Sequence, residues 1–261
     1  MIDIGANLTH ESFQNDFDDV LQRAIDAGIS HMMVTGASAE GSRQALDLAR
    51  RHPQLLSATA GIHPHHAEET TDEVIALLRE LSTQTEVRAI GETGLDYFRD
   101  FSPRDVQMRS FRAHLALAVE TGLPMFLHER DASEDFAAVL SEYRHNLSDV
   151  VVHCFTGDAK ALRAYRDMDC YIGITGWLCD ERRGSHLISL LHDIPVDRLM
   201  IETDAPYLMP RTIRPKPKSR RNEPHYLTWV RDKVAEVLGM SPEEIAARTR
   251  ANAQRFFRLE A

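Results

Sequence analysis

Apolar residues follow two alternating spacings along the chain. Short runs of consecutive apolar residues are each followed by a longer stretch in which apolar residues recur every three or four positions. The short runs predict buried strands and the longer stretches predict amphipathic helices, so the alternation indicates repeated strand–helix units around a parallel sheet. Eight strands are expected, at residues 2–4, 31–35, 56–61, 87–91, 124–127, 150–152, 171–174 and 199–201. Eight units in 261 residues predict an α/β fold, a (β/α)8 TIM barrel, whose usual size is about 250 residues.

Seven helices can be placed from the periodicity. They are expected near residues 16–27, 39–50, 71–81, 105–120, 133–143, 224–238 and 241–257. The last begins Ser241-Pro242-Glu243-Glu244, which supplies an N-cap, a first-turn proline and a capping-box glutamate. No linker or repeat interrupts the pattern, and the proline-rich stretch 210–217 suits a loop over the barrel mouth. We therefore expect a single domain over residues 1–261.

The bulk composition indicates a cytoplasmic protein. Hydrophobic residues make up 43% of the chain, enough to bury a core without disulfides. Three cysteines without CxxC spacing suit reduced thiols rather than a disulfide framework. The sequence has neither the pattern of a signal peptide nor a run approaching the roughly 20 apolar residues of a membrane span. We expect a cytoplasmic protein with no membrane contact and no obligate protein partner.

The net charge limits how the chain could hold nucleic acid. The formal charge is −10, the wrong sign for binding a polyanion over the whole surface. Any such contact must be local, and the obvious place is residues 211–221, which carry six basic side chains. This stretch follows the eighth strand, where such barrels often hold phosphate, so we favour a binding role over a merely solvated loop.

Five of the expected strands end close to an acid or a histidine. The residues are His63, Glu92, His128, His153 and Asp204. All strand C-termini of such a barrel open at one face, so these side chains are expected to meet there. A lone histidine at a strand end is more often a hydrogen-bonded structural residue, but the joint pattern indicates a divalent-metal site. Imidazole with carboxylate suits zinc, manganese or iron, whereas a carboxylate-dominated site suits magnesium.

Local spacing adds detail to this group. Gly91 and Gly94 flank Glu92 closely, and they either leave room for a bulky ligand or form a tight turn, two readings of equal weight. Glu202 and Asp204 lie two positions apart, a spacing that points both carboxylates the same way on an extended segment.

Five segments carry motifs that are specific in combination. They are GIHPH at 61–65, GETGLD at 91–96, HERD at 128–131, HCFTG at 153–157 and ETDAPYL at 202–208, and the pattern extends to YIGITG at 171–176 and RNEP at 221–224. Together they closely resemble the TatD family of metal-dependent deoxyribonucleases over essentially the whole chain. The resemblance implies an amidohydrolase-like barrel and cleavage of DNA phosphodiester bonds. It also implies 3′-to-5′ exonuclease action on single strands and a role in DNA repair or degradation.

The resemblance also assigns roles to individual residues. Glu92, His128 and His153 would be metal ligands, Asp204 a ligand or base, and His63 a further active-site residue. Mg²⁺ is the expected ion, with Mn²⁺ and Zn²⁺ as alternatives. We expect the ion to activate a water whose proton passes to Asp204, while His63 assists departure of the sugar oxygen.

One segment departs from the pattern of related barrels. These carry His-x-His at the end of the first strand, where this chain has Gly5-Ala6-Asn7. Neither glycine nor a neutral amide replaces an imidazole as a strong metal ligand, so we do not expect a fully occupied two-metal site of the common kind. The TatD branch itself begins in this way, which marks a subgroup rather than an inactive enzyme.

Substrate contacts are expected from polar residues near the same face. They are His65, Arg130, Arg220, Arg221 and Asn222. Base stacking could come from aromatic residues in loops at the barrel mouth, although rim packing explains each of them equally well. These are Tyr97, Phe98, Phe101, Trp177 and Tyr207.

Two other functions remain open. The same barrel and metal chemistry can hydrolyse a small ester, amide or lactone, because fold does not fix substrate. A non-catalytic binding barrel is the second alternative, and the presence of Glu92, His128, His153 and Asp204 argues against it.

Overall fold

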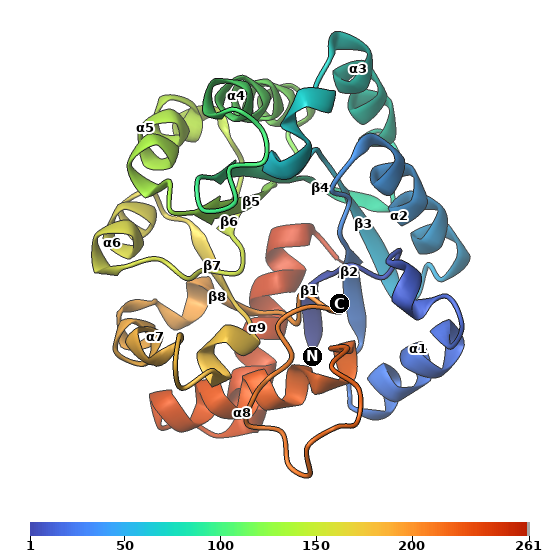
Figure 1. Cartoon of the computed structure of the whole chain (residues 1–261), viewed down its shortest axis with the longest axis vertical. Helices are drawn as coiled ribbons and strands as arrows, with labels where there is room; N and C mark the ends of the chain where they lie inside the picture. The colour runs from blue at the N-terminus through green and yellow to red at the C-terminus, as the bar shows by residue number, and fades with distance from the viewer. Residues whose placement is uncertain (260–261) are drawn as a thin grey trace.

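The computed structural model describes residues 1–259. It contains one sheet of eight parallel strands in sequence order, and Figure 1 shows them as a central ring with helices outside. The strands are β1 (Ile2–Ala6), β2 (His31–Val34), β3 (Leu56–Ala60), β4 (Val87–Asp96), β5 (Met125–Arg130), β6 (Val150–Val152), β7 (Tyr171–Ile174) and β8 (Leu199–Ile201). The helices are α1 (Phe17–Asp26), α2 (Ala39–Arg51), α3 (Asp72–Leu81), α4 (Arg104–Thr121), α5 (Ser133–Tyr143), α6 (Ala159–Asp167), α7 (Ser185–Leu190), α8 (Leu227–Leu238) and α9 (Pro242–Phe257). The predicted TIM barrel is confirmed.

Contacts just beyond the ends of β1 and β8 bring the two ends of the sheet together. The amide of Asn7 donates to the carbonyl of Ala205 at 2.7 Å, and the amide of Asp204 donates to the carbonyl of Gly5 at 2.8 Å. These bonds fix the end of β1 against the segment that carries Asp204. The residues that replace the first-strand histidines therefore border the same space as the acid.

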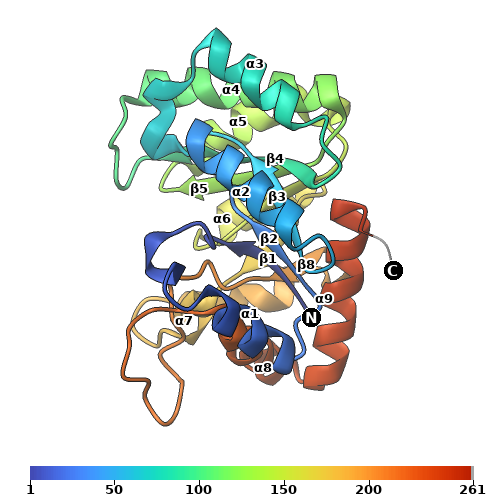
Figure 2. The same ribbon diagram turned by 90° about the vertical axis from the view of Figure 1, so that its right-hand side faces the viewer.

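Helix α9 covers the opposite end of the barrel. Figure 2 shows it alongside the chain N-terminus and the starts of the strands. Its Phe256 and Phe257 join a buried cluster with barrel residues such as Phe126. Ser241 accepts a hydrogen bond from the amide of Glu244 at 3.1 Å, which confirms the predicted N-cap. With this end filled by apolar side chains, chemistry is left to the C-terminal ends of the strands.

Three strands run further than predicted, and the first of them, β1, continues to Ala6. β4 continues to Asp96 and β5 to Arg130, and these two residues are paired across the sheet. The extension needs glycine, because a Cβ at Gly91 would overlap the carbonyl oxygen of Phe126 and one at Gly94 that of His128. A register shift between Ile90 and Thr93 places Glu92 at an irregularity of the strand. The glutamate thus sits inside β4, where we had expected it to follow the strand.

The connection from β8 to α8, residues 202–226, includes the basic stretch. Figure 1 shows it in orange, looping outward from the barrel. Within residues 1–259, no helix is both long and apolar enough to cross a bilayer.

Candidate active site

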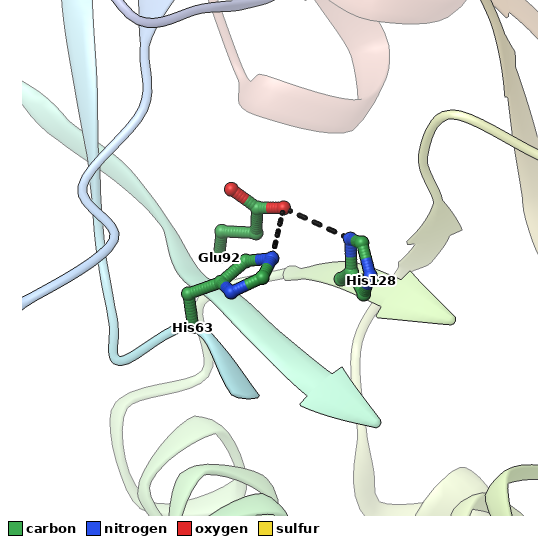
Figure 3. A group of neighbouring side chains, drawn as sticks. All are labelled: His63, Glu92 and His128. Carbon is green, nitrogen blue, oxygen red and sulfur yellow. Dashed lines mark hydrogen bonds and ion pairs between the residues drawn. The ribbon is translucent and has the colours of Figure 1, made fainter. Parts of the chain in front are cut away.

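Three imidazoles converge on one carboxylate oxygen, Oε1 of Glu92. Nε2 of His63 lies 3.3 Å from it, Nδ1 of His128 3.2 Å and Nε2 of His153 2.8 Å. Figure 3 shows the first two rings directed at this oxygen, from the end of β3 and from β5. Four of the five residues predicted to meet at the C-terminal face therefore do so, and the fifth, Asp204, lines the same cavity.

Burial and charge set the protonation of this group. Burial lowers the pKa of His63 to about 4 despite the nearby charge of Glu92, so this imidazole is neutral at pH 7. Burial would raise the pKa of Glu92, but it stays well below its ordinary value, because His63, which is charged only in acid, and His153 oppose protonation of Glu92 by their charges, and His128 and His153 donate hydrogen bonds to it. The site therefore presents one ionised carboxylate beside one neutral imidazole, a combination that suits a metal.

His128 and His153 each lie between two carboxylates. Nε2 of His128 is 3.5 Å from Oδ2 of Asp96, and Nδ1 of His153 is 3.2 Å from Oε2 of Glu202. Burial lowers the pKa of both imidazoles, but their hydrogen bonds and charge contacts with Glu92 and with these second carboxylates outweigh it. The pKa of His128 is raised and that of His153 lies well above its ordinary value. A divalent cation would displace the protons that these two rings hold.

The residues fit a divalent cation. Donor atoms of His63, Glu92 and His128 all lie within 4.8 Å of one another. Nε2 of His128 is buried and, within residues 1–259, its contact with Asp96 at 3.5 Å does not have the geometry of a hydrogen bond, so this atom is left without a hydrogen-bond partner. Two or three imidazoles with one carboxylate form a common ligand set for zinc, manganese or iron, and Mg²⁺ would need additional oxygen ligands such as water.

Asp204 lies in the same cavity, beside the end of β1. Its Oδ1 accepts a hydrogen bond from Nδ2 of Asn7 at 3.0 Å. Burial raises the pKa of Asp204 to about 7, with the charge of His153 acting against the shift and that of Glu92 adding to it. Such a carboxyl group exchanges protons near neutral pH, as a general base should.

Two carboxylates that we had given no role support the histidines. Glu202 is fully buried, and its Oε1 accepts the amide of Cys154 at 2.5 Å. Asp96 is also buried and accepts the amides of Phe98 at 3.0 Å and Arg99 at 2.8 Å. Carboxylates in this position fix the orientation of a ligating imidazole. Their motifs gave a signal, since one closes GETGLD and the other opens ETDAPYL.

The site forms part of an open cavity of about 1020 Å³. Of the five predicted substrate contacts, His65, Arg130 and Arg220 line it. His65 donates from Nε2 to Oδ2 of Asp96 at 2.8 Å, with its side chain 28% exposed. Four of the five predicted aromatic residues also line the cavity, namely Phe98, Phe101, Trp177 and Tyr207.

The other two predicted contacts are engaged elsewhere in the fold. Arg221 donates to Oδ1 of Asp16 at 2.7 Å and to Oε1 of Glu223 at 2.7 Å. Asn222 is buried and donates to the carbonyls of Thr203 at 2.9 Å and Tyr207 at 2.6 Å. These two side chains hold the β8–α8 connection in place.

The ion pairs around Glu223 should make the free energy of unfolding depend on pH. Burial would raise the pKa of Glu223, but hydrogen bonds from His225, Arg23 and Arg221 lower it from 4.5 to about 2. The stabilisation is present above pH 4.5 and is lost as the pH falls toward 2. Glu223→Gln should therefore reduce the free energy of unfolding by roughly 2 kcal/mol at pH 7 and by progressively less toward pH 3.

Urea unfolding at pH 7, 5 and 3.5 measures this effect. Glu236→Gln is the control, because that glutamate is 69% exposed in its pair with Lys233. A Glu223→Gln deficit that stayed constant from pH 7 to 3.5 would contradict the ionic origin of the stabilisation.

Comparison with known proteins agrees with this geometry. The chain matches the model of the family described as TatD related DNase over residues 2–258. A protein of Erwinia tasmaniensis named 3′-5′ ssDNA/RNA exonuclease TatD is 49% identical over 259 residues, which cover 99% of this chain and 100% of that protein. The protein of the same name from Salmonella typhimurium is 48% identical over 263 residues, with 99% of each chain covered.

Solved structures give the same assignment. The TatD homologue YJJV of Escherichia coli has a TM-score of 0.90 at 26% identity, covering 100% of this chain and 98% of that one. A hydrolase of the TatD family from Entamoeba histolytica has a TM-score of 0.87 at 28% identity, with the same coverage. The chain therefore belongs to the family of TatD-related DNases.

Proposed function

We propose that the protein is a divalent-metal-dependent nuclease that hydrolyses phosphodiester bonds of single-stranded DNA from the 3′ end. The observation that carries the proposal is the convergence of three imidazoles on Glu92 at one side of a wide cavity whose rim carries arginine and aromatic side chains. Relatives that are 49% identical over the whole chain are named 3′-5′ ssDNA/RNA exonucleases, which supports the polarity and leaves RNA as a second polymer to test.

We assign the metal to Glu92, His63, His128 and His153. When bound there, a divalent ion lowers the pKa of a water molecule and polarises a phosphate oxygen. Mg²⁺ is the proposed ion, with Mn²⁺ and Zn²⁺ as alternatives. His63 is neutral at pH 7, so it suits the role of ligand better than that of proton donor to the leaving oxygen.

Asp204 serves as the general base. Its pKa of about 7 in the metal-free protein allows it to take a proton from the attacking water near neutral pH. Asn7 holds one of its oxygens through the bond at 3.0 Å, which leaves the other free to face the water. On this proposal Asn7 supports the base, in the place where related barrels have a histidine.

A small ester, amide or lactone remains the alternative substrate. A cavity of about 1020 Å³ lies at the upper limit of small-molecule pockets, which span about 300–1000 Å³. The arginines on its rim would form no ion pair with a neutral ligand, so the cavity favours a polyanion.

A time course on single-stranded oligonucleotides labelled at the 3′ or 5′ end tests the proposal. The reactions contain Mg²⁺, Mn²⁺, Zn²⁺ or chelator, with phosphate-free ester and lactone substrates run in parallel. We expect early release of the 3′ label, a ladder of shortened 5′-labelled products, and no reaction with chelator. Turnover of the ester or lactone with intact oligonucleotide would support the alternative.

We also propose a cytoplasmic location and a role in DNA repair or degradation, which cell fractionation and the repair phenotype of a deletion strain would test.

A further inference from the structure

Four side chains form a continuous stack along one wall of the cavity. The guanidinium carbon of Arg130 lies 3.9 Å from the ring centre of Phe98 and 5.5 Å from that of Trp177. The guanidinium carbon of Arg183 lies 4.3 Å from the centre of the same indole. All four residues line the cavity that contains Glu92. Aromatic faces attract guanidinium groups, so the stack holds Arg130 in a defined position.

The guanidinium of Arg130 lacks a polar partner. Within residues 1–259 it makes no hydrogen bond and no ion pair, although its side chain is half-buried and the chain carries a net charge of −10. Arg183 in the same stack bonds to Oδ2 of Asp180 at 2.9 Å. A guanidinium has five N–H donors in one plane, and here the guanidinium lies over the ring of Phe98, which leaves its edge to bind a ligand. Such an edge matches a phosphate group.

The position of Arg130 separates it from the reacting phosphate. Arg130 follows His128 by two residues on β5, so both side chains are on the same side of the strand. Two residues of an extended strand advance roughly 7 Å toward the barrel mouth. A phosphate on Arg130 is then displaced from one at Glu92 by a distance similar to one nucleotide repeat.

Phe98 supplies a surface for a base beside that phosphate. Its side chain is 54% exposed, although one face of the ring covers Arg130. An exposed aromatic face at a nucleic-acid site stacks on any unpaired base, because every base has a π-face. The pair therefore recognises a nucleotide by its phosphate and its base plane, with no preference for base identity.

We propose that Arg130 and Phe98 form a subsite for the nucleotide next to the scissile phosphate, with Arg130 binding its phosphate and Phe98 stacking on its unpaired base. The inference rests on the proposed nuclease function and specifies how that site holds a chain. Because digestion from the 3′ end leaves the chain extending on the 5′ side, this subsite takes the nucleotide on that side. A substrate with a single phosphodiester cannot reach it.

Binding of a fluorescent hexathymidylate to chelator-treated protein tests the subsite without requiring turnover. We expect Arg130→Gln to weaken binding by about tenfold or more and to reduce the slope of log Kd against log salt by about 0.7, the value for one phosphate contact on a single strand. Phe98→Ala should weaken binding by about tenfold with an unchanged slope, since it removes stacking alone. Arg130→Lys should recover the slope but not the full affinity, because an ammonium does not reproduce the planar fork.

Arg104→Gln is the matched control. Its guanidinium lies 4.2 Å from the ring centre of Tyr97 and pairs with Asp100 at 3.2 Å, but it does not line the cavity. We expect its affinity and salt slope to equal those of the wild type. Thermal unfolding checks that each variant is folded, and an unchanged affinity in folded Arg130→Gln would overturn the proposal.

Kinetics separate the subsite from the reacting centre. Arg130→Gln should lower kcat/KM for the oligonucleotide by about tenfold or more and lower that for bis(p-nitrophenyl) phosphate by a much smaller factor. An equal loss on both substrates would place Arg130 at the scissile phosphate and overturn the subsite. If wild-type protein cleaved neither substrate, the proposed nuclease function would be wrong. Binding of hexathymidylate to the chelator-treated protein would still test the subsite. Failure of wild-type protein to bind hexathymidylate would reject the subsite.

Discussion

Replacing Glu92 with glutamine should lower phosphodiester turnover by at least about 10³-fold. Oε1 of Glu92 is the one atom that His63, His128 and His153 all approach, at 3.3, 3.2 and 2.8 Å. A neutral amide of the same shape leaves the imidazoles in place but removes the anionic ligand, and metal affinity depends on that charge. Calorimetric titration with Mn²⁺ should show the loss of metal binding alongside the loss of rate.

The fold should tolerate this change. Glu92 lies at the mouth of the barrel, while the apolar interior is built from residues such as Phe126 and from α9. Removing one partner of a buried ion pair usually costs several kcal/mol, but His128 and His153 can release their protons when the carboxylate is gone. We therefore expect the free energy of unfolding of the metal-free protein to change by less than about 2 kcal/mol.

A matched control separates the local effect from a general one. Glu134→Gln removes an equal charge from the start of α5, where the glutamate is 79% exposed and pairs with Lys160. This variant should keep the wild-type rate and metal affinity. If Glu92→Gln retained more than about a tenth of the wild-type rate, the ligand assignment would be wrong.

The strands and their order could be predicted from the sequence because each strand is a short apolar run. β6 and β8 have the predicted bounds, Val150–Val152 and Leu199–Ile201, since both are simple aliphatic triplets followed by polar residues. The convergence of His63, Glu92 and His128 followed from the same pattern, because parallel strands deliver their ends to one face. Strand ends are thus the part of the site that local sequence determines.

Pairings between distant side chains could not be predicted in the same way. The basic stretch suggested a nucleic-acid contact at Arg221, but its guanidinium is bound by Asp16, 205 positions away in the chain. No feature of the sequence near either residue predicts that ion pair. Gly5 is a similar case. The sequence shows that no histidine stands at this position, but it does not show that the side chain of Glu202 occupies the space beside it.

Gly5→Ala should lower turnover by roughly 10- to 100-fold, because the added methyl group displaces the carboxylate of Glu202, which orients a metal ligand and does not contact the substrate. A Cβ at Gly5 would lie 2.5 Å from Oε2 of Glu202 and 3.1 Å from the ring of Phe126. The carboxylate can move away only by giving up its present contacts, because Oε1 is bonded to the amide of Cys154 at 2.5 Å and is closely bordered by Gly173. Its displacement breaks the contact with Nδ1 of His153, which holds that imidazole in register with the metal site.

A compensating variant makes the steric origin of the Gly5→Ala loss testable. Glu202→Asp shortens the side chain that the new methyl group meets, so the double variant should lose less activity than the sum of the two single losses in free energy. Gly41→Ala, in the first turn of α2 and not among the residues that line the cavity, is the control for the glycine replacement itself. Additive losses in the double variant would show that Gly5 acts through something other than Glu202. A less-than-additive loss would show that Gly5, in place of the first-strand histidine, leaves the space that the buried carboxylate of Glu202 occupies. Glu202 would then orient His153 through its Nδ1 atom.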